Sequence, residues 1–141
     1  MVISDCDAWP STINHVKSTA LLVSRDAISL VVFRNALAEA GFEIEISTGT
    51  RNALSALESE NVKAIIVDCD DVDGGKDFLS WAARKHAKSA IIVALTNHLT
   101  TLHEAFDMGA TFVLQKPLNS ERVTRCMRAS SQLLAPQPQI Q

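Results

Sequence analysis

Short apolar runs and longer amphipathic stretches alternate along most of this chain. Three apolar runs, at 19–23, 63–67 and 90–95, are predicted to be buried strands, and a further strand is predicted at 111–115. A fifth run, 42–47, alternates strictly between apolar and polar residues, which is typical of a strand with one wetter face. Helical spacing of apolar residues follows each run, at 27–41, 50–60, 76–87, 100–109 and 119–134. The pattern therefore predicts five strands and five helices in alternation.

Several of these strands are apolar on both faces, which is typical of parallel strands covered by helices on each side. Right-handed crossovers between such strands produce an α/β fold, a three-layer α/β/α sandwich. Five β-α units favour the flavodoxin-like (βα)5 arrangement, with a five-stranded parallel sheet in the order 2-1-3-4-5. Within the helix at 50–60, we expect Ala53, Leu54 and Leu57 to face the core.

The length of 141 residues suits one domain, which we expect to span 18–133. Residues 1–17 are predicted to be an N-terminal extension, in which Trp9 packs on the domain, and 134–141 a flexible tail or linker. A formal net charge of −3 argues against nucleic-acid binding by this domain. The absence of a signal-peptide pattern and of a long apolar run predicts a cytoplasmic protein that does not enter a membrane.

Polar side chains gather where the predicted strands end. They are Ser24, Arg25, Asp26, Asp68, Asp70, Thr96 and Lys116. The carboxyl ends of parallel strands share one edge of the sheet, so we expect these groups to lie near one another. A carboxylate that attacks phosphorus, with a hydroxyl and an ammonium to bind the phosphoryl oxygens, fits phosphoryl transfer to an aspartate.

On these residues, the chain resembles the receiver domain of two-component response regulators over roughly 18–133. The matching motifs are Asp68 after "AIIV", Thr96 after "IIVAL", and "LQKP" with Lys116 and Pro117. The resemblance implies that Asp68 is the phosphoacceptor and that Thr96 and Lys116 form the phosphate-binding switch. It also implies a cis Lys116–Pro117 bond, and a signalling role rather than an enzymatic one. A histidine kinase, a phosphotransfer protein or another signalling protein would be the partner.

The chain departs from the family where an acidic pair normally holds Mg²⁺. Those two positions are Ser24 and Arg25, and Asp26 comes one residue later. Mg²⁺ prefers oxygen ligands, which leaves Asp26, Asp68 and Asp70 as the candidate metal ligands. Arginine at a ligand position brings a fixed positive charge, and its guanidinium could pair with Asp68 in place of the cation. We therefore expect weak phosphorylation, or a protein-interaction module that works without it.

Two further departures concern the switch and the partner surface. The loop after Asp68 is short and lacks proline, and the position of the usual switch aromatic is Val113. Its neighbour Phe112 should point to the opposite face of the strand. By analogy, a partner or a second copy would bind the face formed by the fourth helix, fifth strand and fifth helix. Candidate residues there are Leu99, Leu102, Phe106, Arg122 and Arg125.

Other interpretations of the same residues stay open at this point. Asp68 may be read as a structural acid paired with Lys116 or Arg25, and Asp26 as the cap of the helix that follows it. Asp70 would then belong to a solvated acidic turn. "IIVDCDDV" also fits the start of a haloacid-dehalogenase-like phosphatase, with Asp68 as nucleophile and Asp70 as general acid. A flavodoxin-like cofactor binder would need a richer phosphate loop than "SRDAIS".

Overall fold

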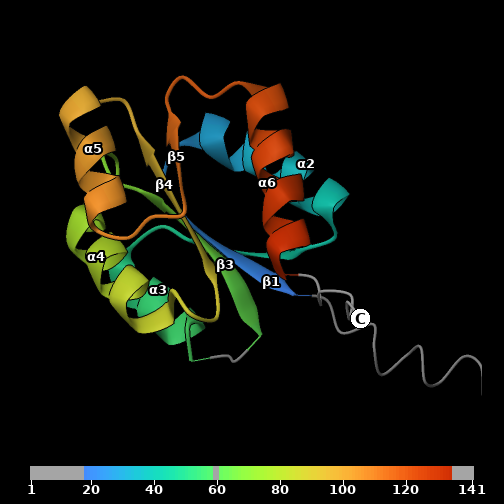
Figure 1. Cartoon of the computed structure of the whole chain (residues 1–141), viewed down its shortest axis with the longest axis horizontal. Helices are drawn as coiled ribbons and strands as arrows, with labels where there is room; N and C mark the ends of the chain where they lie inside the picture. Colours follow the sequence, from blue (N-terminus) through green and yellow to red (C-terminus); the bar gives the residue numbers. More distant parts are fainter. Residues whose placement is uncertain (1–17, 59–60, 135–141) are drawn as a thin grey trace, which may run out of the picture.

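The computed structural model describes residues 18–58 and 61–134, with the side chains of 99–102 left out. The predictions for 1–17, Trp9 among them, and for 135–141 lie outside these residues. Five strands and five helices alternate along the described part (Figure 1). The strands are β1 Thr19–Val23, β2 Glu43–Ser47, β3 Val62–Asp68, β4 Ile91–Thr96 and β5 Phe112–Gln115. The helices are α2 Ala27–Ala40, α3 Thr50–Ala56, α4 Gly75–His86, α5 Leu99–Asp107 and α6 Ser120–Leu134.

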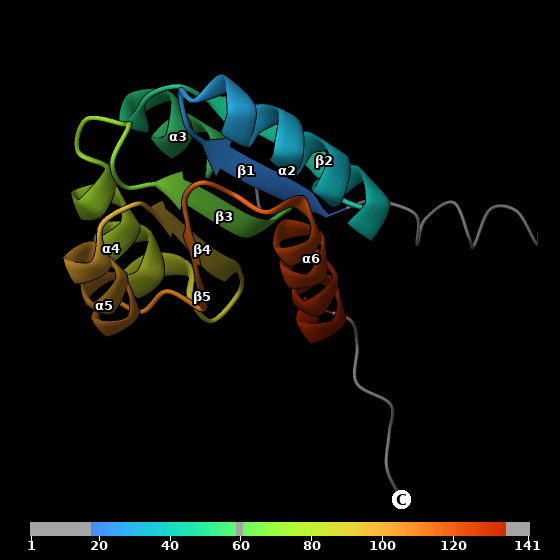
Figure 2. The same ribbon diagram turned by 90° about the horizontal axis from the view of Figure 1, so that it is seen from above.

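The strands form one parallel sheet in the order β2-β1-β3-β4-β5, as predicted. Helices α3, α4 and α5 cover one face of the sheet, and α2 and α6 cover the other (Figure 1, Figure 2). The central strands β1, β3 and β4 are buried almost throughout, because they have helices on both sides. This is the three-layer flavodoxin-like sandwich expected from the apolar runs.

The sheet divides the interior into two apolar clusters. Leu21, Ile65 and Ile92 point toward α3, α4 and α5, whereas their neighbours Leu22 and Ile66 point toward α2 and α6. Successive side chains of a strand lie on opposite faces, so each central strand feeds both clusters. Every one of these five side chains is fully buried.

Local signals fix the ends of the longest helices. Asp26 caps α2 by accepting a hydrogen bond from the Ile28 backbone, and Gly41 ends the helix with φ 92°. That left-handed conformation is one that glycine adopts at little cost. At the start of α6, Asn119 Oδ1 accepts a hydrogen bond from the Arg122 backbone at 3.1 Å, as expected of an N-cap residue.

One expectation about the core is wrong. Leu54 was predicted to face inward, but its side chain is 45% exposed. Helix α3 spans only seven residues and contacts the sheet through Ala53 and the following Leu57, which are four residues apart. Leu54 lies about 100° round the helix from Ala53, so it falls beside that narrow contact. On α4, by contrast, Phe78, Leu79 and Ala82 are all buried.

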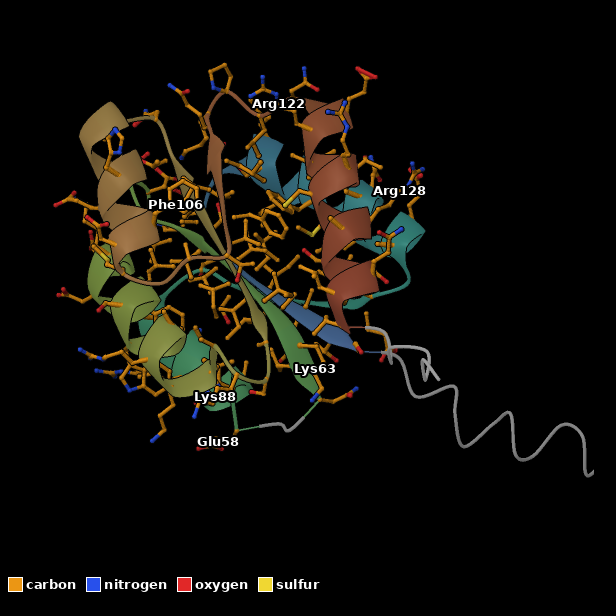
Figure 3. All side chains as sticks on the ribbon, in the orientation of Figure 1. Glu58, Lys63, Lys88, Phe106, Arg122 and Arg128 are labelled. Atoms are coloured by element: carbon orange, nitrogen blue, oxygen red, sulfur yellow. The ribbon has the colours of Figure 1, made fainter. Side chains whose placement is uncertain are left out.

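In the part of the chain that the structure describes, no helix is both long and apolar enough to cross a membrane. The amino-terminal edge of the sheet carries Glu58, Lys63 and Lys88, and it lies at the opposite end of the molecule from Arg122 (Figure 3). The residues predicted to carry the chemistry follow the carboxyl ends of the strands instead.

Candidate functional site

The candidate site lies at the carboxyl edge of the sheet, where β1, β3, β4 and β5 end side by side. Ser24 follows β1, Asp68 ends β3, Thr96 ends β4 and Lys116 follows β5. Register brings them together, because Val23 pairs with Val67 and Asp68 pairs with Leu95. Ser24, Asp68 and Thr96 are each fully buried, although their side chains are polar. Buried polar groups need hydrogen-bond partners: Ser24 and Asp68 bind each other, and Thr96 binds Asp70.

The Asp68 carboxylate is the centre of the site. Ser24 Oγ donates to Asp68 Oδ2 at 3.1 Å, and Lys116 Nζ donates to both carboxylate oxygens at 2.9 and 3.0 Å. The backbone N–H groups of Asp70 and Asp71 donate to Oδ1 at 3.2 and 3.1 Å. A fully buried carboxylate is tolerable only with such donors, and those from a charged group are the strongest. The carboxylate therefore has a complete set of partners from the chain itself.

Lys116 supplies the countercharge, as the sequence predicted. Its side chain is 14% exposed, against 0% for Asp68. Partial burial alone would lower the pKa of Lys116, but the hydrogen bond and charge of Asp68, with the charges of Asp70 and Asp71, raise it above its ordinary value. Lys116 is thus a firmly protonated partner. The peptide bond between Lys116 and Pro117 is cis, as the resemblance implied.

Asp70 has a position that the sequence did not predict. Its Oδ1 accepts a hydrogen bond from Thr96 Oγ1 at 3.0 Å, and its Oδ2 accepts one from the Asn97 backbone at 2.6 Å. The interpretation of a solvated turn is therefore wrong for Asp70, whose carboxylate joins two loops, while Asp71 is exposed. The hydroxyl of Thr96 also accepts a hydrogen bond from the His98 backbone at 3.1 Å. Thr96 and Asn97 lie 26 and 27 positions after Asp70, and no pattern in the sequence links residues so far apart.

Asp26 and Arg25 do not join this network in the way the sequence allowed. Asp26 accepts hydrogen bonds from Ser29 Oγ at 2.7 Å and from the Ile28 backbone, so it acts as the cap of α2. The hydrogen bond from Ser29 lowers the pKa of Asp26. Arg25 is exposed and, among the described residues, forms no ion pair with Asp68. The expected pairing of the guanidinium with Asp68 is therefore not what this structure contains.

The residues present do not fit a magnesium site well. Within 18–58 and 61–134, no three His, Cys, Asp or Glu side chains gather as a group that could hold a metal ion. Of the three candidate ligands, Asp26 caps a helix, Asp70 binds Thr96 and Asn97, and Asp68 is paired with Lys116. Mg²⁺ demands several oxygen ligands in a near-octahedral arrangement, which these committed carboxylates do not offer.

Gly75 brings the start of α4 against the end of β3. A Cβ at this position would lie 3.2 Å from the Cys69 Cα, which is tight, and 2.8 Å from the Asp68 carbonyl oxygen, which is closer than side chains come to backbone atoms. Gly74, the residue before it, has φ 73° and starts the helix from a left-handed conformation. This pair of glycines lets the short loop after Asp68 enter α4 at once.

Two neighbours of the site have no chemical role in this geometry. Burial raises the pKa of the Cys69 thiol to about 12, with the charges of Asp70 and Asp68 adding to the effect, so the thiolate is scarce at neutral pH. Val113 packs against the cluster beneath α3, α4 and α5, and Phe112 against the cluster beneath α2 and α6. The prediction that these two side chains lie on opposite faces is confirmed.

Known proteins resemble this chain in sequence and in fold. No profile of a known protein family matches the chain. Among curated proteins, the chain is 28% identical over 121 residues to the photosynthetic apparatus regulatory protein RegA of Rhodobacter capsulatus. That alignment covers 84% of this chain and 66% of RegA, so the chain spans just under two thirds of the length of its relative.

Solved structures give the fold directly. A response regulator receiver domain protein from Methanospirillum hungatei has a TM-score of 0.72 at 20% identity, covering 84% of this chain and 96% of that one. A response regulator from Thermotoga maritima has a TM-score of 0.69 at 17% identity, covering 82% of this chain and all of that one. The chain therefore has the fold of response-regulator receiver domains.

Proposed function

We propose that this chain is a receiver-type signalling domain whose output depends on protein binding more than on phosphorylation of Asp68. The fold and the similarity to RegA support the first half of the proposal. The second half rests on one observation: the Asp68 carboxylate is fully buried and accepts hydrogen bonds from Ser24, Lys116 and two backbone amides. In this role Asp68 is chiefly a structural acid, and phosphorylation is a slow side reaction.

The hydrogen bonds explain why phosphorylation should be slow. A carboxylate attacks phosphorus through an oxygen lone pair, and both oxygens of Asp68 already accept hydrogen bonds from Lys116 Nζ. Charge that builds up on a transferring phosphoryl group needs cations or donors aimed at it. With Ser24 and exposed Arg25 where the family has two acids, the site offers no ligand set for the Mg²⁺ that would supply this charge.

Two surfaces support binding of a protein partner. Helix α2 exposes Ile28 and Val31, with 70% and 55% of each residue open to solvent, next to the end of β1. These residues lie one turn apart on α2 and form an apolar patch, which suits a histidine kinase or phosphotransfer protein. Because the patch is part of α2 itself, a partner could bind there whether or not Asp68 is modified.

The second surface is the edge formed by α5, β5 and α6, here named the α5–β5–α6 face. A groove of about 470 Å³ lies on it, with an apolar floor and arginines at its rim. Its lining residues are Phe112, Leu114, Arg122, Arg125, Cys126 and Ala129. Phe106 on α5 is half exposed, and Arg122 lies in the first turn of α6 (Figure 3). The side chains of Leu99 and Leu102, also expected here, lie outside the described residues. The face suits a signalling partner or a second copy.

Intact mass spectrometry after incubation with acetyl phosphate and Mg²⁺ tests the proposal. We expect less than a few per cent of the protein to gain one phosphoryl group, with Asp68→Asn as the control for the site of attachment. A stoichiometric adduct that disappears in Asp68→Asn would overturn the proposal. The double substitution Ser24→Asp, Arg25→Asp restores the missing acids and should raise the adduct, which would show that their loss is the cause.

A phosphatase of the haloacid-dehalogenase type is the second candidate, and the geometry favours it less. Its general acid would be Asp70, yet the Asp70 carboxylate accepts hydrogen bonds from Thr96 and Asn97. An acid held in this way is committed to a second loop and is poorly placed to protonate a leaving group. We therefore propose that the chain is not an enzyme. Steady hydrolysis of p-nitrophenyl phosphate, lost in Asp68→Asn, would reverse that choice.

A further inference from the structure

The Asp70 carboxylate bridges two loops of the candidate site. Asp70 belongs to the loop between β3 and α4, and its partners are Thr96, the last residue of β4, and Asn97, the first residue of the loop that follows. The two hydrogen bonds use both carboxylate oxygens, at 3.0 and 2.6 Å. One side chain therefore holds two consecutive residues at the entrance to α5.

The hydroxyl of Thr96 is fully committed by this contact. A hydroxyl has one proton to donate, and that proton is directed at Asp70 Oδ1. The oxygen accepts the His98 N–H at 3.1 Å, and the residue is fully buried. A phosphoryl oxygen on Asp68 would need the same proton. Asp70 and a phosphoryl group are thus alternative acceptors for Thr96, and Asp70 is the one built into the chain.

The same contact reaches the partner surface through the backbone. His98 precedes α5 as its cap residue but makes no side-chain capping hydrogen bond, and the Asp70 carboxylate binds the backbone N–H of Asn97, the residue just before it. On the other side, the Lys116 backbone N–H donates to the Thr96 carbonyl at 2.9 Å. The ends of β4 and β5 and the start of α5 are therefore tied to one carboxylate.

We propose that Asp70 is an internal latch, a carboxylate that stands in for a phosphoryl group. It takes the proton of the Thr96 hydroxyl and holds the start of α5 in one arrangement while Asp68 is unmodified. This inference deepens the proposed function and rests on it, because the latch gives the α5–β5–α6 face a fixed shape without phosphorylation. Asp70 acts through Thr96 and Asn97, so it is a positioning residue.

Hydrogen exchange of the full chain, followed by mass spectrometry, tests the latch with Asp70→Asn. The substituted amide cannot accept from both donors, because its NH₂ group would face either the Thr96 hydroxyl or the Asn97 N–H. We expect hydrogen exchange in residues 96–107 to become about tenfold faster, because losing a hydrogen bond to a charged acceptor favours local opening by roughly that factor. Asp71→Asn is the matched control, since it removes the same charge from the exposed neighbour, and its exchange should match the wild type.

Two results would refute the latch. One is equal exchange in Asp70→Asn and Asp71→Asn. The other is a uniform acceleration that includes β3, which would make Asp70 an ordinary stabilising residue. Thr96→Val approaches the contact from the other side: its effect on 96–107 should be less than additive with Asp70→Asn, and Thr96→Ser should restore wild-type exchange. A phosphoryl adduct on the wild type would count against the proposed function and would leave this comparison unchanged.

Discussion

Replacing Lys116 by Met leaves the buried Asp68 carboxylate without its cation. Removing one partner of a buried ion pair costs about 3–5 kcal/mol, because the remaining charge stays out of water. Asp68 is fully buried and Lys116 is nearly so. Ser24 and two backbone amides still donate to the carboxylate in the variant, which favours the lower end of that range. We therefore expect a loss of about 3 kcal/mol in the free energy of unfolding at pH 7.

The contribution of Lys116 to stability depends on pH. Because its pKa is raised above 10.5, that contribution is present below 10.5 and disappears as the pH rises further.

Urea denaturation followed by far-ultraviolet circular dichroism at pH 7 measures the loss. The exposed pair Lys76–Glu104, whose side chains are 45% and 52% exposed, provides the matched control. Lys76→Met should cost less than about 1 kcal/mol, as exposed ion pairs do. Asp68→Asn in the Lys116→Met background should recover most of the loss. A cost for Lys116→Met that equals that of Lys76→Met would refute the reasoning.

Three further predictions concern the helix starts and the buried thiols. Asp26→Ala should lower the free energy of unfolding by about 1 kcal/mol, whereas Asp26→Asn should keep the helix cap. Because the pKa of Asp26 is lowered in the folded state, the difference between Asp26→Ala and the wild type should fade as the pH drops below 3.8, as urea titrations would show. Gly75→Ala should lower the free energy of unfolding by more than about 2 kcal/mol, because the added methyl group overpacks against β3. Gly49→Ala has open space around it and should cost only a few tenths of a kcal/mol, as thermal melts would show. Cys69 and Cys126, whose pKa values burial raises to about 12 and about 11, should resist iodoacetamide at pH 8 until urea unfolds the protein, as peptide mass mapping would show.

Hydrophobic patterning predicted the elements and the sheet order because each central strand is a short, continuous apolar run. It also placed Asp68, Thr96 and Lys116 at one edge, since parallel strands end together. A cation beside Asp68 followed from charge, because a buried carboxylate needs one, and of the two candidates, Lys116 and Arg25, it is Lys116 that pairs with Asp68. These predictions depended on periodicity and on the direction of the strands, both of which can be read locally.

The contacts that depend on loop geometry could not be predicted in the same way. Whether Asp70 is solvated or bound to Thr96 depends on how two loops approach each other, and neither loop has a periodic pattern. Arg25 and Asp68 have opposite charges, but Arg25 is exposed while Ser24 takes the place beside the carboxylate. Leu54 was misplaced because a seven-residue helix contacts the sheet along a narrow strip, which helical spacing alone does not locate.

The division of the interior by the sheet has a consequence for how the chain can vary. Substitutions beneath α2 and α6 and substitutions beneath α3, α4 and α5 are separated by a layer of backbone, so their effects on stability should largely add. Changes in Met127 of α6 need not be compensated by changes in Leu79 of α4. The apolar cluster beneath α2 and α6 and the cluster beneath α3, α4 and α5 can therefore accumulate mutations independently of each other.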